Sequence, residues 1–150
     1  MLGHGHWLYA PYFLGEVDGE LVASMTYYTP TDTRDVGVVE FVQTAEAHRE
    51  KGIASALMSR LIEQFEGAGG LALYLCTTNP AAGTLYEQHG FRYHVGDGMR
   101  YLAPGAEDFD QEYLGHSGTA QIRPATWGDL PRASVLYNNA EPGWIVKDYL

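Results

Sequence analysis

The sequence predicts an α/β (α+β) fold in which helices flank a mixed β-sheet. Short runs rich in β-branched and aromatic residues alternate with segments in which apolar residues recur at helical spacing. The run 71–76 is apolar on both faces, which is typical of a central strand covered by helices on either side. With 150 residues, of which 45% are hydrophobic, the chain is long enough for one compact core.

The first half of the chain predicts a hairpin and then a third strand. Residues 12–17 and 20–29 are strand-like, and Asp18-Gly19 between them tolerates the positive φ angles of a tight turn. After a cluster of turn-forming residues, the segment 36–42 is rich in Val and Phe and predicts the third strand.

The next segment predicts a helix over residues 52–66. Four apolar residues recur there at every fourth position: Ile53, Leu57, Leu61 and Phe65. Gly67 then provides a stop for the helix, and the run 71–76 forms the central strand. Asn79-Pro80 is typical of the start of a second helix, which Gly90 ends.

The end of the chain predicts a hairpin, a linker and a strand followed by a helix. Residues 91–95 and 99–102 are strand-like and joined by a glycine-containing turn. Residues 104–118 lack a clear period and predict a linker. Residues 120–123 predict a strand, and a weak capping box at 126–129 predicts a helix through Leu136 and Tyr137.

Composition excludes several classes of partner. The net charge of −10 argues against binding nucleic acid or an anionic membrane, since both are held by clustered Lys and Arg.

Cys76 is the one cysteine, so no internal disulfide forms, and we expect a buried, inert thiol. No apolar segment is long enough to span a membrane and no secretory signal is evident, which predicts a cytoplasmic protein. His4 and His6 lack further ligands at a recognisable spacing, so we expect no metal.

The candidate binding site is the loop His48-Arg49-Glu50-Lys51-Gly52-Ile53-Ala54. It joins a strand to a helix, where unpaired N–H groups and the helix dipole both favour an anion. Arg49 and Lys51 would be unfavourable cations at a helix start unless an anion is present. The loop therefore predicts a site for a phosphate or pyrophosphate.

Two sequence motifs then indicate a family. The loop fits the pattern Arg/Gln-x-x-Gly-x-Gly/Ala, and the later segment contains Asn79 followed by Leu85-Tyr86 and Gly90-Phe91. Both motifs, in this order and at this spacing, resemble the signatures of the Gcn5-related N-acetyltransferase (GNAT) superfamily. The resemblance covers about residues 12–103, which we expect to form the core domain as residues 1–103.

The resemblance implies a splayed sheet with acetyl-coenzyme A (acetyl-CoA) as acyl donor, wedged between the strands at Val42 and Leu75. It implies that the backbone of Val42 and Thr44 pairs with the pantetheine arm and that Asn79 contacts the coenzyme. Tyr86 would protonate the departing thiolate. The pyrophosphate would be held by the amides of Arg49, Glu50, Lys51, Gly52, Ile53 and Ala54.

A general base is harder to assign. Strand alternation places Glu40 on the same face as Val42 and Thr44, which could direct it to the cleft as a base or water-relay partner. A strand carboxylate is more often simply solvated or paired. Asp35 is a weaker candidate for the base.

The predicted function is transfer of an acetyl group from acetyl-CoA to a primary amine of a small molecule or peptide by direct attack. The alternative is a non-catalytic acyl-CoA-binding module or half of a tandem GNAT protein. The chain departs from the family order because it begins almost at the first hairpin. Residues 119–150 resemble the opening of a family domain displaced to the C-terminus. This segment could complete its own chain's sheet, exchange into a neighbour as a swapped homodimer, or begin a truncated second domain.

Overall fold

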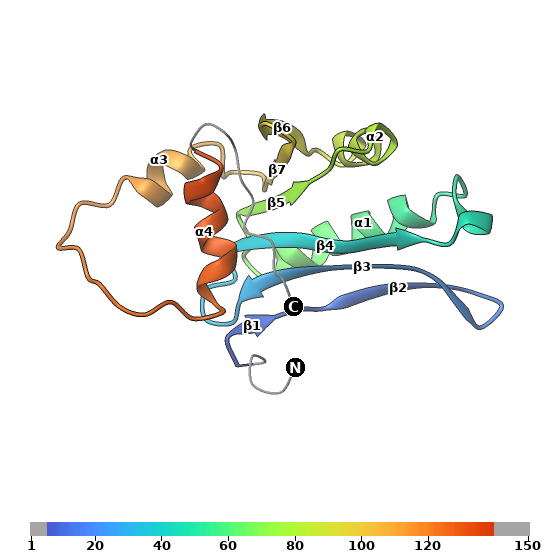
Figure 1. Cartoon of the computed structure of the whole chain (residues 1–150), viewed down its shortest axis with the longest axis horizontal. Helices are drawn as coiled ribbons and strands as arrows, with labels where there is room; N and C mark the ends of the chain where they lie inside the picture. The colour runs from blue at the N-terminus through green and yellow to red at the C-terminus, as the bar shows by residue number, and fades with distance from the viewer. Residues whose placement is uncertain (1–5, 140–150) are drawn as a thin grey trace.

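A seven-stranded mixed sheet organises the part of the chain that the computed structural model describes, residues 6–139 (Figure 1). Its order is β1-β3-β4-β5-β7-β6, with β2 pairing with β3 next to β1. The strands are β1 (Leu8–Tyr9), β2 (Tyr12–Val17), β3 (Glu20–Pro30), β4 (Val36–Thr44), β5 (Ala72–Cys76), β6 (Arg92–Val95) and β7 (Gly98–Leu102). The helices are α1 (Ile53–Gly67), α2 (Pro80–Gln88), α3 (Phe109–Leu114) and α4 (Asp129–Tyr137), with a 3₁₀ turn η1 (Glu46–His48). The mixed α/β architecture predicted from the sequence is thus confirmed.

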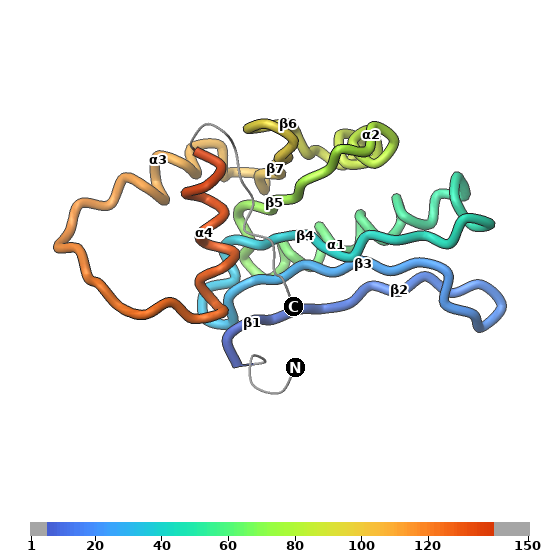
Figure 2. Tube along the Cα trace, viewed as in Figure 1, coloured from blue at the N-terminus to red at the C-terminus, as the bar shows by residue number. Residues whose placement is uncertain are grey.

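Helices cover both faces of the sheet, and β5 shows why. Leu73 and Leu75 point into a core shared with α1, whereas Ala72 and Tyr74 point into a second core that contains Val135 of α4. Successive strand residues face opposite sides, so an entirely apolar strand needs cover on both. In Figure 2, α1 lies behind the central strands and α4 crosses in front of them.

Several local predictions are confirmed. Asp18 and Gly19 adopt φ angles of 53° and 84° in the turn between β2 and β3. The Asn79 side chain accepts a hydrogen bond of 3.0 Å from the Ala81 N–H and so caps α2, with Pro80 in its first turn. Short-range turn and cap chemistry therefore determined these positions.

The parallel pairing of β4 with β5 is short, and it positions the site. It covers three residue pairs, Val36 with Ala72, Gly37 with Leu73 and Val38 with Tyr74. Beyond Val38 the two strands separate, so one edge of β4 lacks a partner strand. The splay predicted by the family resemblance is present.

A β-bulge interrupts β4 just after this separation. Two steps along β3, from Ser24 to Thr26, oppose three steps along β4, from Gln43 to Glu40. Phe41 has a φ of 52°, which is rare for a bulky residue. The extra residue makes the predicted alternation wrong. The β3 partners of Glu40 and Gln43 lie two residues apart, so these two side chains share a face of the sheet. Val42 and Thr44 lie on the other face.

The prediction of a buried Cys76 is wrong. The thiol is exposed at the end of β5. Its cross-strand neighbour is Gly98, which has no side chain to cover it.

Two predictions for the C-terminal third are also wrong. The segment 104–118, predicted as an irregular linker, contains α3, whose Phe109 is buried and whose Asp110 pairs with Arg100 at 2.7 Å. Residues 120–123 form no strand, and Ile122 is fully exposed. Strand propensity depends on packing against neighbouring strands, and within residues 6–139 no strand pairs with this segment.

The predicted C-terminal helix is present as α4 and packs on the same chain. The Asp129 carboxylate accepts a hydrogen bond of 2.7 Å from the Thr126 N–H. This is the bond that the acidic residue of a capping box makes back to the start of the helix. Arg132 of α4 donates to Thr33 at 2.7 Å and lies 3.5 Å from Asp32 in the turn between β3 and β4. Residues 1–5 and 140–150, including His4, lie outside the described part of the chain.

The docking of α4 can be tested with two adjacent residues. Val135 is fully buried against the sheet, whereas Leu136 is 62% exposed. Val135→Ala should lower the free energy of unfolding by about 2 kcal/mol, because buried methyl groups are lost and a cavity remains. Leu136→Ala should change it by less than about 0.5 kcal/mol. Chemical denaturation measures both, and equal effects would contradict this packing.

Candidate active site

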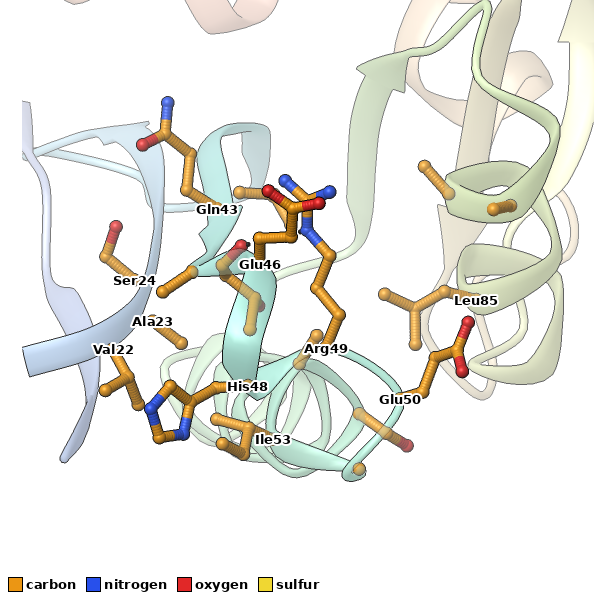
Figure 3. Close-up of a pocket in the computed structure, with 18 of the residues that line it drawn as sticks. Val22, Ala23, Ser24, Gln43, Glu46, His48, Arg49, Glu50, Ile53 and Leu85 are labelled. Carbon is orange, nitrogen blue, oxygen red and sulfur yellow. Dashed lines mark hydrogen bonds between the residues drawn. The ribbon is translucent and has the colours of Figure 1, made fainter. Parts of the chain in front are cut away.

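A cleft of about 1380 Å³ opens where β4 and β5 separate. Its walls come from Leu14 of β2, the start of β3 and the end of β4, from the loop and first turn of α1, and from one side of α2. Figure 3 shows Arg49 and Glu50 on the loop, with Ala23 on one side and Leu85 of α2 on the other. The cleft therefore joins the strand opening to the helix start.

The loop before α1 is shaped by two residues in the left-handed region. Glu50 and Gly52 have φ angles of 59° and 77°. Gly52 is the N-cap of α1, and a Cβ there would meet no atom within 4 Å. The glycine therefore serves backbone conformation rather than close packing.

The start of α1 has the electrostatics of an anion site. Its N-cap makes no side-chain hydrogen bond, and its first turn contains no acidic residue. The first N–H groups of a helix lack intrahelical acceptors, and the dipole is positive at this end. Ile53, Ala54 and Ser55 all line the cleft. An anion in the cleft would satisfy groups that the protein leaves without a cap.

Arg49 links this loop to β4. Its Nε donates to the Thr44 carbonyl at 3.1 Å, which holds the loop against the end of the strand. The Thr44 carbonyl still has a second lone pair for another donor. Arg49 is exposed, so the guanidinium also has N–H groups available to solvent or ligand.

Most predicted binding residues line the cleft. These are Val42, Thr44, Arg49, Glu50, Gly52, Ile53, Ala54 and Asn79. The cleft lining does not include Lys51, Glu40 or Tyr86. Residues that sequence reasoning did not select include Ser24, Gln43, Glu46, Ser55 and Leu85. Ser55 directly follows the loop motif, so its place in the first helical turn could have indicated it.

The two predicted catalytic residues lie close enough to interact. Tyr86 is 6% exposed and packs against Phe91, with ring centroids 5.9 Å apart. Burial, followed by the negative charge of Glu40, raises the pKa of Tyr86 to about 12. The phenol is therefore protonated throughout the neutral range, as a proton donor must be.

The sequence profile of the acetyltransferase (GNAT) family matches residues 4–91, more than half of the chain. The chain belongs to the acetyltransferase (GNAT) family. It is an N-acetyltransferase that depends on acetyl-CoA as donor. No curated protein matches the sequence.

Solved acetyltransferase structures share the fold. An N-acetyltransferase called PaiA from Thermoplasma acidophilum, in complex with coenzyme A, has a TM-score of 0.56 and 14% identity over 63% of this chain and 61% of its own. A GNAT acetyltransferase from Elizabethkingia anophelis with acetyl-CoA bound has a TM-score of 0.53 and 17% identity over 63% of this chain and 76% of its own. A ribosomal-protein-alanine N-acetyltransferase from Brucella melitensis has a TM-score of 0.53 and 21% identity over 63% of this chain and 69% of its own. At these identities the likeness shows the fold alone.

Within residues 6–139 no group of three or more His, Cys, Asp or Glu side chains could hold a metal ion. Over the same residues, each helix is too short or too polar to cross a bilayer.

Buried phenols give the stability a pH dependence. Burial raises the pKa of Tyr27, Tyr74 and Tyr86 from 10.0 to about 12. The unfolded chain loses these protons first, so the contribution of these phenols to stability is constant below pH 10 and is lost as pH rises from about 10 through about 12. Each phenol contributes about 2 to 3 kcal/mol to this fall.

We therefore expect Tyr86→Phe to show a smaller loss of stability between neutral and strongly alkaline pH than the unchanged protein. Denaturant unfolding across this range measures it, with tyrosinate absorbance as the monitor of ionisation. An identical loss in both proteins would show that Tyr86 is not shielded from solvent.

Proposed function

We propose that this GNAT enzyme transfers the acetyl group of acetyl-CoA to a primary amine of a small molecule or peptide by direct attack. The observation that supports this most is the uncapped start of α1 in the wall of a cleft between two separated strands. A diphosphate fits the helix start because it supplies the missing acceptors. An extended amide-bearing arm fits the open edge of β4.

In this proposal the donor is held by backbone groups from two elements. The amides across Arg49 to Ala54 bind the diphosphate, and the cations of Arg49 and Lys51 add to the attraction. The backbone of Val42 and Thr44 pairs with the pantetheine arm where β5 has left β4. Asn79 contacts the coenzyme while capping α2.

Tyr86 and Glu40 would manage the protons. The amine nitrogen forms a bond to the thioester carbon, and the bond from that carbon to sulfur breaks. Glu40 takes the amine proton, directly or through a water molecule, and Tyr86 gives its phenolic proton to the departing sulfur. The influence of Glu40 on the pKa of Tyr86 supports their acting together.

The bulge in β4 supports a division of the two substrates between faces of the sheet. Val42 packs against the core on the α1 side, whereas Glu40 lies on the opposite face. An acceptor amine can then approach Glu40 from the face opposite α1.

The net charge of −10 favours encounter with a cationic acceptor such as an amino sugar or polyamine. The Brucella melitensis enzyme shares the fold and is named for a protein alanine, so a peptide amine is also an acceptor to test.

Of the segment 119–150, residues 140–150 lie outside the described part of the chain, and we propose that residues 119–139 complete the fold within the same chain rather than through a swapped dimer. The contacts of Arg132 and Val135 with the turn and face of the sheet support this. The mass in solution should then be that of one chain. A dimer that dissociates when residues 119–150 are removed would instead indicate exchange between chains.

The function is tested by binding and transfer together. Calorimetric titration should show one acetyl-CoA bound per chain, with affinity that falls as salt rises because charges hold the diphosphate. A panel of an amino sugar, a polyamine and an alanine-initiated peptide should then reveal acetylation of at least one amine. Binding without transfer would favour a non-catalytic module, and no binding would defeat the proposal.

Tyr86→Phe tests the proton donor. Removing the hydroxyl from a buried ring preserves its packing, so binding of acetyl-CoA should be unchanged. Turnover should fall by about 10²-fold or more, because the sulfur must leave without a proton. Steady-state kinetics with the best amine of the panel measures this. Phe91→Leu is the packing control, and a turnover of Tyr86→Phe equal to that of the unchanged enzyme would refute the role.

A further inference from the structure

A hydrogen bond links α1 to the end of α2 across one side of the cleft. The Ser55 Oγ and the His89 Nε2 are 2.9 Å apart, although the residues are 34 positions apart in sequence. Both side chains are partly buried. Within residues 6–139 no other side-chain hydrogen bond joins these two helices.

Each end of this bond lies at a position that matters for the reaction. Ser55 is in the first turn of α1 and lines the cleft. His89 is the C-cap of α2, and its backbone N–H donates to the Tyr86 carbonyl at 3.0 Å. The same carbonyl accepts from the Phe91 N–H at 3.1 Å. The bond therefore connects the turn proposed to bind the diphosphate with the turn that carries the proposed acid.

The imidazole is not needed to end α2. The C-cap bonds of His89 are made by its backbone N–H, and Gly90 supplies the positive φ of 90° that ends the helix. Removing the ring therefore leaves the helix end satisfied. What the ring adds is the contact with Ser55.

The chemistry of the ring suits a fixed contact. Burial lowers the pKa of His89, so the ring is neutral near pH 7. A neutral imidazole has one donor nitrogen and one acceptor nitrogen, and Nε2 in either state can bond to a hydroxyl. Ser55 and the first turn of α1 are thus held in one position in both tautomers.

We propose that His89 is a positioning residue for donor binding, which holds Ser55 and the first turn of α1 in register with the turn that carries Tyr86. This inference rests on the proposed function. The cleft lining includes Ser55 but not His89, so the ring acts through Ser55. Breaking the bond leaves the diphosphate-binding amides present but less fixed, so the donor loses affinity because the amides must be ordered on binding.

A double-mutant cycle tests the link. Ser55→Ala and His89→Leu should each raise the KM for acetyl-CoA by about two- to tenfold, the range for one lost hydrogen bond. The double variant should rise no further than the larger single effect, because both changes remove one interaction. His89→Gln, which can present an amide near the place of Nε2, should recover most of the affinity. Ser117→Ala is the matched control, because this exposed serine between α3 and α4 does not line the cleft, and it should leave KM unchanged.

The outcomes separate this inference from the proposed function. If the unchanged protein binds acetyl-CoA and acetylates an amine, but the two effects on KM are additive or absent, the positioning role is wrong. If the unchanged protein neither binds nor transfers, the proposed function fails first and this inference fails with it. Should His89→Leu not fold, Ser55→Ala alone decides, since an unchanged KM in that variant overturns the role.

Discussion

The separation of β4 from β5 is the constraint on which the site depends. The other edge of β4 pairs with β3, and β5 pairs with β7 along its length from Ala72 to Cys76. β4 and β5 are therefore each held by an antiparallel neighbour, β3 and β7. Opening the sheet between them removes only hydrogen bonds between β4 and β5. At the closed end, Gly37 allows close contact, because a Cβ there would lie 2.7 Å from the Leu73 side chain. The gap is thus a stable feature of the sheet rather than a weak point in it.

The second determinant is local charge in an acidic protein. A net charge of −10 would repel a coenzyme carrying phosphates if the surface were uniform. Glu46 and Glu50 line the cleft, but the first turn of α1 itself has no carboxylate and no capping side chain. Arg49 and Lys51 lie next to that turn. Attraction over the few ångströms around a helix end outweighs a distant net charge that salt screens.

The sequence predicted those features that short-range chemistry controls. The turn at Asp18-Gly19 and the cap at Asn79 each depend on residues within a few positions of one another. It failed where the outcome depends on a distant neighbour. Cys76 is exposed because Gly98 lies opposite it, and residues 120–123 form no strand because no strand lies beside them.

The bulge at Phe41 shows how one such miss alters the chemistry inferred from a sequence. Alternation assigned Glu40 to the face of Val42 and Thr44, which would have placed base and donor on one side. One extra residue in β4 reverses that assignment and turns Glu40 toward the opposite face, although its charge still reaches Tyr86. A bulge is set by pairing with β3 and has no fixed residue signature, so only the register could reveal it. The irregularity in the strand, and not the residue pattern, therefore decides which face of the sheet Glu40 occupies.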